Sequence, residues 1–206
     1  MKVDVTLKLA TSLDGRIATE SGESKWITGE AARAEGHRLR ALHDAILVGV
    51  ETVLADDPEL TVRVPGAEGQ PVRVVLDSTL RTPPTARLAA PNTLILTTVD
   101  PRPVGEAEIV RLAYSGRPEP DVVLDRLGER GIASVLIEGG GQVAASFLRA
   151  GLVNRLEWFR APILLGGEGR PCVAALALAK LSEAPKFRRL SAEAVGDDLW
   201  ERYERI

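Results

Sequence analysis

One carboxylate and three consecutive glycines follow a short apolar run in the second half of the chain. Val135–Ile137 predicts a buried strand, Glu138 ends it, and Gly139–Gly141 lead into small residues typical of a helix start. Because glycine has no Cβ and a helix N-terminus has free N–H groups, such a turn favours an anion, typically a phosphate. Open α/β sheets bind ligands at this end of their strands, so we expect a phosphate site beside an acid.

The glycines by themselves do not identify a ligand. Gly139, Gly141 and Ala144 match the dinucleotide-binding pattern G-x-G-x-x-A, but the match is weak alone and lies late in the chain. The acidic residue that this pattern places about 20 positions further on is not evident. A glycine-rich turn without a ligand stays the alternative. Glu138 favours ligand binding, because a carboxylate is unusual at a purely structural strand end.

Other titratable residues also fall at predicted strand ends and in turns. Asp14 and Asp57, which precede a glycine and a proline, are interpreted as residues that order their own turns. Cys172 has no base partner in the sequence and is interpreted as a small buried residue. Trp26 lies among polar residues, where a tryptophan more often contacts a ligand or an interface than a core. The remaining members of this group are Lys8, Asp56 and Asp77.

Three cationic or titratable residues share one face of a predicted helix. Arg33, His37 and Arg40 recur at i, i+4 and i+7 in a segment over residues 30–42. Such a stripe is either a solvated face or part of a phosphate site, and the spacing fits both. His37 and His43 have no further ligand at metal spacing, so we interpret both as helix-surface or helix-end residues and expect no metal site.

Composition limits the classes of protein that fit. A chain of 206 residues with 45% hydrophobic residues suits one sizeable domain or two small ones. A net charge of −3 without a basic run argues against nucleic acid as the main partner. The single cysteine excludes an internal disulfide and a multi-cysteine zinc site, and favours a reducing, cytoplasmic compartment. No apolar signal core and no apolar run of about 18 residues occur, so we expect no membrane partner.

Strand and helix signals alternate through most of the chain. The predicted fold class is therefore α/β, with a largely parallel central sheet flanked by helices and antiparallel C-terminal edge strands. We expect one domain over residues 1–206, and Thr28 as the N-cap of the first helix. Expected strands cover residues 5–10, 45–48, 72–76, 93–97, 108–113, 134–137, 155–163, 187–190 and 199–203; expected helices cover residues 30–42 and 121–130, one turn at 50–54, and a segment that Gly151 ends.

Six segments of the chain form a specific combination, although each alone is not specific: Thr11–Ala18, Ser21–Thr28, Thr52–Arg63, Val75–Ser78, Ile137–Gly141 and Ala161–Gly167. In this order they resemble the reductase domain of bacterial riboflavin-biosynthesis deaminase/reductases, over essentially the whole chain. The resemblance implies a dihydrofolate-reductase-like fold. It also implies NADPH-dependent reduction of the ribosyl group of a phosphoribosylaminopyrimidine to ribityl.

The resemblance further implies roles for individual positions. Hydride would pass from nicotinamide C4 to C1′ of a ring-opened imine, with Lys8 and Glu138 as catalytic residues. Glu138 would orient the ribose hydroxyls and stabilise the cationic imine; Lys8 would assist ring opening or deliver a proton, unless it only extends from its strand end to solvent. The cofactor would contact Ala10, Trp26, Thr52, Asp56, Ser78, Gly140, Gly141, Gln142, Val143, Ala144, Ala145 and Ser146. The substrate would contact Ser24, Arg40, Leu60, Arg63 and Glu138, with Arg40 and Arg63 on its phosphate.

Departures from the family pattern leave the substrate open. No His-x-Glu with a downstream Pro-Cys-x-x-Cys occurs, so we expect no deaminase domain. Gln142 stands where relatives often have threonine, and its amide still donates to a phosphate. The form of Ser24–Thr28 favours 5-amino-6-(5-phosphoribosylamino)uracil as substrate. The alternatives are the undeaminated 2,5-diamino-6-ribosylamino-pyrimidinone 5′-phosphate, a pterin-like heterocycle, which needs no arginine clamp, and a non-catalytic dimeric binding module.

Two further expectations concern assembly and cofactor choice. Arg155–Phe159 puts bulky side chains on both faces of one strand, which a monomer would expose, so we predict a homodimer. Ser78, with Arg81 close in sequence, favours the 2′-phosphate of NADPH over NADH. Asp77 is the competing feature, because its carboxylate would suit a ribose hydroxyl instead.

Overall fold

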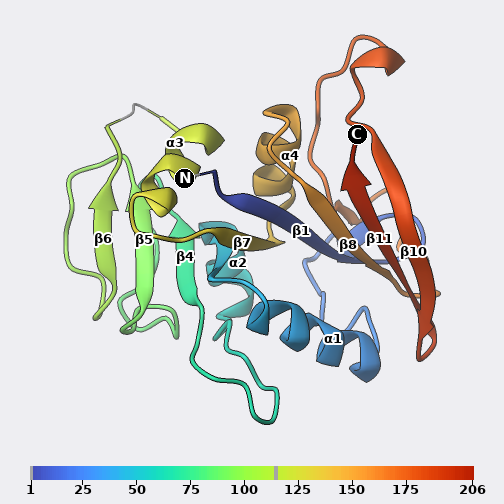
Figure 1. Ribbon diagram of the computed structural model, residues 1–206, viewed down its shortest axis with the longest axis horizontal. Helices are drawn as coiled ribbons and strands as arrows, with labels where there is room; N and C mark the ends of the chain where they lie inside the picture. Colours follow the sequence, from blue (N-terminus) through green and yellow to red (C-terminus); the bar gives the residue numbers. More distant parts are fainter. Residues whose placement is uncertain (1, 114–115) are drawn as a thin grey trace.

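A sheet of nine strands forms the centre of the computed structural model, which describes residues 2–113 and 116–206 (Figure 1). Strand β11 runs antiparallel to both of its neighbours, and the other pairings in this sheet are parallel. Strand β10 forms one edge and β6 the other. From edge to edge the strands are β10 (Phe187–Val195), β11 (Asp198–Arg205), β8 (Arg155–Arg160), β1 (Asp4–Thr11), β7 (Ser134–Gly139), β3 (Ala45–Gly49), β4 (Val72–Leu76), β5 (Thr93–Thr97) and β6 (Glu108–Arg111).

Helices cover both faces of this sheet. Leu7 and Ile137 pack into the cluster that holds the apolar residues of α3 and α4, whereas Leu136 packs against α1 on the opposite face. This alternation follows from the two-residue period of a strand. No helix in the described part of the chain has the length and apolar character that a membrane crossing needs. The helices are α1 (Glu30–Ala41), α2 (Val50–Asp56), α3 (Pro120–Gly128) and α4 (Gly141–Arg149), with a 3-10 turn at Leu181–Glu183.

Strand β3 shows why the sequences of the central strands are continuous apolar runs. All five of its residues are buried, and their sequence is AILVG. A parallel strand with helices on both faces has no solvent side, so its side chains do not alternate in polarity. The five residues of β5 are buried in the same way. The carboxyl ends of these strands therefore meet at one edge of the sheet, where side chains with other roles gather.

The expected α/β class is confirmed, and β4 and β5 have the predicted bounds of residues 72–76 and 93–97. The predicted N-cap is wrong: α1 is capped by Gly29, not Thr28. The Gly29 N–H donates to Asp198 Oδ2 at 2.7 Å. A carboxylate from the start of β11 therefore completes the helix terminus, a contact that local sequence does not contain.

Helix α2 has two turns instead of the single predicted one, and ends at Asp57 in the left-handed region with φ 41°. The Asp57 carboxylate accepts from the Arg87 backbone N–H at 2.9 Å. Asp57 therefore does more than the expected ordering of its own turn, because it also holds a residue 30 positions away. The single domain expected over residues 1–206 stays a prediction; Met1, Tyr114 and Ser115 lie outside the described residues.

Two short strands were not predicted from the sequence. β2 (Arg16–Ala18) and β9 (Arg170–Pro171) form a separate antiparallel pair. The segment after β9 bonds two other parts of the chain. The Cys172 N–H donates to Gly15 O at 3.0 Å, and the Ala174 N–H donates to Gly141 O at 2.9 Å. The pair therefore joins the turn after β1 to the start of α4.

Strand β8 ends at Arg160, three residues before its predicted end, and its bulky side chains are satisfied within one chain. Trp158 Nε1 donates to Thr11 Oγ1 at 2.9 Å. Phe159 is fully buried and stacks on Trp200 with ring centroids 5.2 Å apart. The argument that a monomer would expose these bulky side chains is therefore wrong, because Leu156 and Phe159 are buried and Trp158 is partly buried within one chain.

Candidate active site

A crevice is expected where neighbouring parallel strands send their connections in opposite directions. The chain leaves β3 through α2 toward β4, whereas it leaves β7 through α4 toward β8, on the far side of β1. Thr52 of α2 and Gly139 of β7 meet at this point, since a Cβ placed on Gly139 would lie 2.8 Å from Thr52 Oγ1. The edge formed by the ends of β1, β7, β3 and β4 therefore carries the candidate site.

Three charged side chains from three elements converge beside this crevice. Glu138 of β7 accepts two hydrogen bonds from Arg40 of α1, at 2.5 Å from Nε and 2.9 Å from Nη2. Lys8 of β1 has its Nζ 4.0 Å from Glu138 Oε2. The Glu138 side chain is 6% exposed and the other two are 18% exposed. The register of β1 on β7 pairs Leu7 with Ile137, so the next residues along point to the same face.

The three charged groups in this cluster shift one another's pKa values. Burial would raise the pKa of Glu138, but the hydrogen bonds and charge of Arg40, with smaller contributions from Lys8 and His37, hold that pKa below its ordinary value. Burial lowers the pKa of Lys8, and Arg40 lowers it further, while Glu138 acts in the opposite direction. The site therefore offers a fixed carboxylate anion and an amine that gives up its proton more readily than an exposed lysine.

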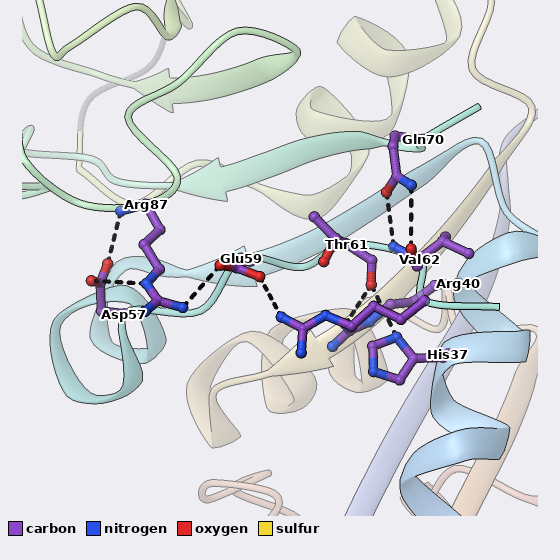
Figure 2. Close-up of polar contacts among 9 residues, drawn as sticks. His37, Arg40, Asp57, Glu59, Thr61, Val62, Gln70 and Arg87 are labelled. Carbon is purple, nitrogen blue, oxygen red and sulfur yellow. Dashed lines mark hydrogen bonds and ion pairs between the residues drawn. The ribbon is translucent and has the colours of Figure 1, made fainter. Parts of the chain in front are cut away.

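The segment Asp57–Arg63 is held against α1 by contacts from several directions (Figure 2). The Thr61 carbonyl accepts from Arg40 Nη1 and from His37 Nδ1, each at 3.0 Å. The Gln70 side chain pairs with the backbone of Val62 through both its oxygen and its nitrogen. Arg40 thus connects Glu138 to this segment, and the expected substrate contact Leu60, 4% exposed, lies within it.

The two expected phosphate ligands differ in their surroundings. Arg40 uses three of its five N–H groups on Glu138 and Thr61, so two remain. Arg63 is mostly exposed and pairs with Glu59, which also accepts from Arg87 Nη1 at 3.0 Å (Figure 2). Exposed ion pairs of this kind contribute little to stability and are readily replaced by an anionic ligand.

The glycine turn serves packing as well as the crevice. A Cβ on Gly141 would lie 2.7 Å from Pro171 O, and one on Gly139 would touch Thr52, so both glycines are required by neighbours within the chain. The expectation that the turn lets a ligand reach the backbone stays a prediction at these two positions. Gly140, with φ 88°, caps α4 without a side-chain hydrogen bond, and a Cβ there would make only ordinary contacts, the nearest 3.6 Å from Val143 Cγ2. The N–H groups of the first helical turn are the anion-binding feature that remains.

Of the expected cofactor contacts on α4, Gln142 is exposed and Val143 is half-buried. Ala144 and Ala145 are buried, and the Ala144 N–H already donates to Gly140 O at 3.0 Å. The free N–H groups of α4 therefore lie in its first turn. Ser146 Oγ donates to the Val143 carbonyl at 2.8 Å.

A narrow cavity of about 40 Å³ connects the glycine turn to β1. It brings the expected catalytic Lys8 next to the expected cofactor contacts Ala10 and Gly140, with Cys172 at its wall. Cys172 is buried, as predicted, and burial raises the pKa of its thiol. A larger cavity of about 390 Å³ is lined by Arg40, His43, Asp44 and Gln70 among others, but not by Lys8, Glu138 or the glycine turn over residues 139–141. The smaller cavity is therefore the one that adjoins the chemistry.

The stripe on α1 is not a solvated face. Arg33 stacks over the Trp26 ring, with its Cζ 4.6 Å from the ring centroid, and donates to Thr28 O at 2.6 Å. His37 and Arg40 converge on one carbonyl, as described above. His43 lies at the helix end, as predicted, with ring nitrogens near Leu39 O at 2.7 Å and Thr6 Oγ1 at 3.0 Å.

Trp26 is 69% exposed and lies in the loop that precedes α1. In the same loop, Ser24 Oγ is 3.4 Å from Asp56 Oδ1 at the end of α2. The expected substrate contact Ser24 and the expected cofactor contacts Trp26 and Asp56 are thus brought to one side of the crevice, although 32 positions separate Ser24 from Asp56 in the chain.

The Asp77 carboxylate is buried and hydrogen-bonded within the chain, so it is not available to a ligand. It accepts from Arg81 N at 2.9 Å and from Thr82 N and Oγ1 at 2.7 Å each. The alternative in which Asp77 binds a ribose hydroxyl is therefore wrong. Ser78 is half-buried at the carboxyl end of β4, and its carbonyl accepts from Thr97 Oγ1 at 3.2 Å.

Asp14 makes long-range hydrogen bonds that its local sequence does not indicate. It accepts from Ser12 Oγ at 2.6 Å, and also from the backbone N–H groups of Leu165 and Gly166 at 3.2 and 2.8 Å. The Ser12 hydrogen bond, with these two, lowers its pKa to about 2. Asp14 therefore ties the turn after β1 to a loop 152 positions away. The resemblance of both segments to one family was the signal that they act together.

Comparisons with known proteins agree with this geometry. The model of the RibD C-terminal domain family matches residues 3–200. The riboflavin biosynthesis protein RibD of Actinobacillus pleuropneumoniae is 42% identical over 95% of the chain and 55% of its own length. The 2,5-diamino-6-ribosylamino-4(3H)-pyrimidinone 5′-phosphate reductase of Methanothermobacter thermautotrophicus is 39% identical over 98% of both chains.

A solved structure from Thermotoga maritima is similar over the whole chain and 57% of its own, with 30% identity and a TM-score of 0.85. It is described as a diaminohydroxyphosphoribosylaminopyrimidine deaminase/5-amino-6-(5-phosphoribosylamino)uracil reductase. The chain thus spans little more than half the length of the RibD proteins that it matches. The expected dihydrofolate-reductase-like fold is confirmed by the strand order and by similarity to solved structures of this kind.

Replacing Arg40 by alanine tests the charge cluster. The variant leaves the Glu138 carboxylate nearly buried, with Lys8 at 4.0 Å as its remaining described cation. Breaking a buried ion pair from one side costs about 3–5 kcal/mol, so the free energy of unfolding at pH 7 should fall by roughly that amount. The loss should shrink at low pH: Arg40 lowers the folded pKa of Glu138, so its contribution is complete above the unfolded pKa of about 4.3 and disappears as the pH falls through the folded pKa.

Urea unfolding of both proteins across this pH range measures the effect. Arg38→Ala is the matched control, since Arg38 lies on the same helix in an exposed pair with Glu35. Its effect should stay within about 0.5 kcal/mol at every pH. Equal losses in the two variants would contradict the role given to Arg40.

Proposed function

The chain belongs to the RibD C-terminal domain family, and we propose that it uses NADPH to reduce the ribosyl group of a phosphorylated ribosylaminopyrimidine in riboflavin biosynthesis. The observation that carries the proposal is the Lys8–Glu138–Arg40 cluster. It lies at the edge of the sheet where Gly140 opens the turn and α4 presents free N–H groups. A dinucleotide phosphate and a carboxylate–amine pair therefore fit the same crevice.

The nicotinamide cofactor supplies the hydride, and the chain's own residues prepare the acceptor. The Glu138 carboxylate faces the ribose, where its negative charge stabilises positive charge that develops as the imine forms at C1′. Arg40 holds this carboxylate in place through two hydrogen bonds. Lys8 assists ring opening or delivers a proton, a role that suits an amine whose pKa burial lowers.

Residues around the crevice hold the two ligands. The substrate phosphate is bound by Arg40 and Arg63, and the rest of the substrate by Ser24, Leu60 and Glu138. The cofactor contacts Ala10, Trp26, Thr52, Asp56 and Ser78, and its pyrophosphate lies on the α4 terminus from Gly140 to Ser146. At this terminus the reachable groups are the N–H groups of the first turn, so Ala144 and Ala145 act by closing the floor of the site.

The substrate that we propose is 5-amino-6-(5-phosphoribosylamino)uracil, the compound named for the similar Thermotoga maritima protein. A second candidate is the undeaminated 2,5-diamino-6-ribosylamino-pyrimidinone 5′-phosphate. The full-length similarity to the Methanothermobacter thermautotrophicus reductase, which is named for it, favours this candidate. Steady-state reduction of each compound, followed by NADPH absorbance, distinguishes the two through kcat/KM. The proposed compartment is the cytoplasm, in keeping with a single cysteine.

NADPH should be preferred to NADH at least about tenfold in kcat/KM. Charge-assisted hydrogen bonds contribute about 1.5–3 kcal/mol each, and one of them is enough for this ratio. Ser78 is the expected donor, and the neighbouring Asp77 carboxylate is already occupied by Arg81 and Thr82. Ser78→Ala should reduce the preference, while the exposed neighbour Thr79→Ala keeps it. Equal kcat/KM for the two cofactors in the wild type would refute the assignment.

Glu138→Gln should lower kcat by about 10²-fold or more, as for positioned electrostatic groups. The amide keeps the size of the side chain and removes the charge. NADPH affinity, measured by fluorescence, should barely change because the cofactor phosphates bind backbone N–H groups. Arg63→Ala should instead raise the substrate KM, as expected for loss of a remote anchor.

Thermal unfolding confirms that both variants are folded before their kinetics are compared. Wild-type turnover by Glu138→Gln, or failure of that variant only because NADPH no longer binds, would show Glu138 to be a structural strand end.

A homodimer is also part of the proposal. Its support is the family resemblance, together with large apolar side chains exposed in one stretch of the chain. Leu164 is 72% and Leu181 is 89% exposed, with Ile163 and Leu178 at 40% and 43%. Such a surface is typical of an interaction site. Light scattering at micromolar concentration should give twice the monomer mass, and a single species at the monomer mass would rule the dimer out.

A further inference from the structure

His37 lies where the two expected phosphate ligands and the segment beside them meet (Figure 2). It is one helical turn before Arg40 on α1, and both side chains bond the Thr61 carbonyl at 3.0 Å. The two residues therefore point to the same side of the helix. Thr61 precedes Arg63 by two positions, so the segment that fixes His37 also carries the second arginine.

The contact with Thr61 fixes the state of the imidazole ring. A carbonyl oxygen only accepts hydrogen bonds, so Nδ1 carries the proton and donates. In the neutral ring Nε2 is then an acceptor without a hydrogen, and protonation of the ring turns it into a donor. The residue is half-buried, so part of its side chain is in contact with solvent.

Charged groups from three elements face this ring. Arg40 lies on its own helix, Arg63 on the neighbouring segment and Glu138 at the end of β7. Burial, and then Arg40 and Arg63, hold the pKa of His37 below its ordinary value, against the opposing effects of the Thr61 hydrogen bond and Glu138. His37 is therefore neutral at pH 7 when only these groups surround it.

We propose that His37 is a third ligand of the substrate phosphate, beside Arg40 and Arg63, and that it binds as the imidazolium through its Nε2–H. The inference rests on the proposed function for the identity of the phosphorylated substrate. A phosphate dianion on the two arginines offsets their two repelling positive charges and places a negative oxygen beside the ring, which favours a proton on the ring. The ring takes up that proton from solvent when the ligand binds, and Nε2–H donates to a phosphate oxygen.

Proton uptake gives phosphate affinity a defined pH dependence. The pKa of His37 is higher in the complex than in the free protein, so binding is tightest where the ring is charged in the complex. Affinity must then fall as the pH rises through the pKa of the complex. Phosphate monoesters have a second pKa of about 6, so the ligand is a dianion from pH 7 to pH 9. A change in that window reports the protein and not the ligand.

Ribose 5-phosphate is the probe, because it carries the sugar phosphate without the pyrimidine. In isothermal titration calorimetry its affinity for the wild type should fall by up to about tenfold from pH 7 to pH 9, which is about 1.4 kcal/mol. Buffers of different ionisation enthalpy should reveal proton uptake at pH 7. His37→Gln keeps hydrogen bonding without titration, and should bind several-fold more weakly at pH 7, with no pH dependence. Ribose without phosphate should not distinguish the two proteins.

The two histidines of the chain allow a direct observation. In ¹⁵N spectra of the imidazole rings, ribose 5-phosphate should raise the pKa of His37. The ring signals of His43 should not respond to the ligand, because both of its ring nitrogens already have partners. His43→Gln is the matched control and should keep the affinity and pH dependence of the wild type. In turnover, His37→Gln should raise the substrate KM and leave kcat nearly unchanged.

The outcomes separate this inference from the proposed function. If His37→Gln binds ribose 5-phosphate like the wild type, or the His37 signals do not respond, the inference is wrong although pyrimidine reduction still stands. The same holds if the wild type reduces the pyrimidine without binding the sugar phosphate. If ribose 5-phosphate binds with the expected His37 response but no pyrimidine is reduced, the phosphate site stands and the proposed function fails.

Discussion

The buried ion pair between Glu138 and Arg40 is the interaction on which the candidate site depends. It joins the end of β7 to α1, and through Arg40 Nη1 it reaches the Thr61 carbonyl as well. Removing such charges from water is costly, and the cost is offset only when geometry and hydrogen bonds are nearly complete. A buried ion pair often stabilises a fold no more than a hydrophobic pair would, so fold stability alone does not explain the two charges, in keeping with the role proposed for them.

The same pair explains how one site holds an anion and a cation close together. Arg40 keeps Glu138 ionised despite burial, and Glu138 opposes the loss of charge by Lys8. In surroundings of low polarity these interactions are stronger than in water. The arrangement is made before any ligand binds, so little reorganisation is needed when charge develops on a substrate. The inference about His37 extends this principle, since its ring lies within reach of the same charges.

Contacts between distant segments complete the rim of the crevice. Asp14 bonds two backbone N–H groups of the loop after β8, and Pro171 lies against Gly141 so closely that a side chain there would collide. Arg33 stacks on Trp26 and so orders the loop before α1. These residues touch none of the three central charges in the contacts described above, yet they fix the loops from which the ligand contacts project.

The sequence by itself determined the fold class, the central strands and the position of Glu138 before a glycine turn, because hydrophobic periodicity and turn chemistry are local properties. It could not determine which partner each polar side chain meets. Thr28 has the local signature of a helix cap, yet Gly29 is the N-cap, and its N–H donates to Asp198 from the far end of the chain. Asp14 has the local signature of a turn residue, yet its carboxylate also accepts from the backbone N–H groups of Leu165 and Gly166. Only tertiary structure decides such cases, because a hydrogen bond depends on distance in space and not on separation in sequence.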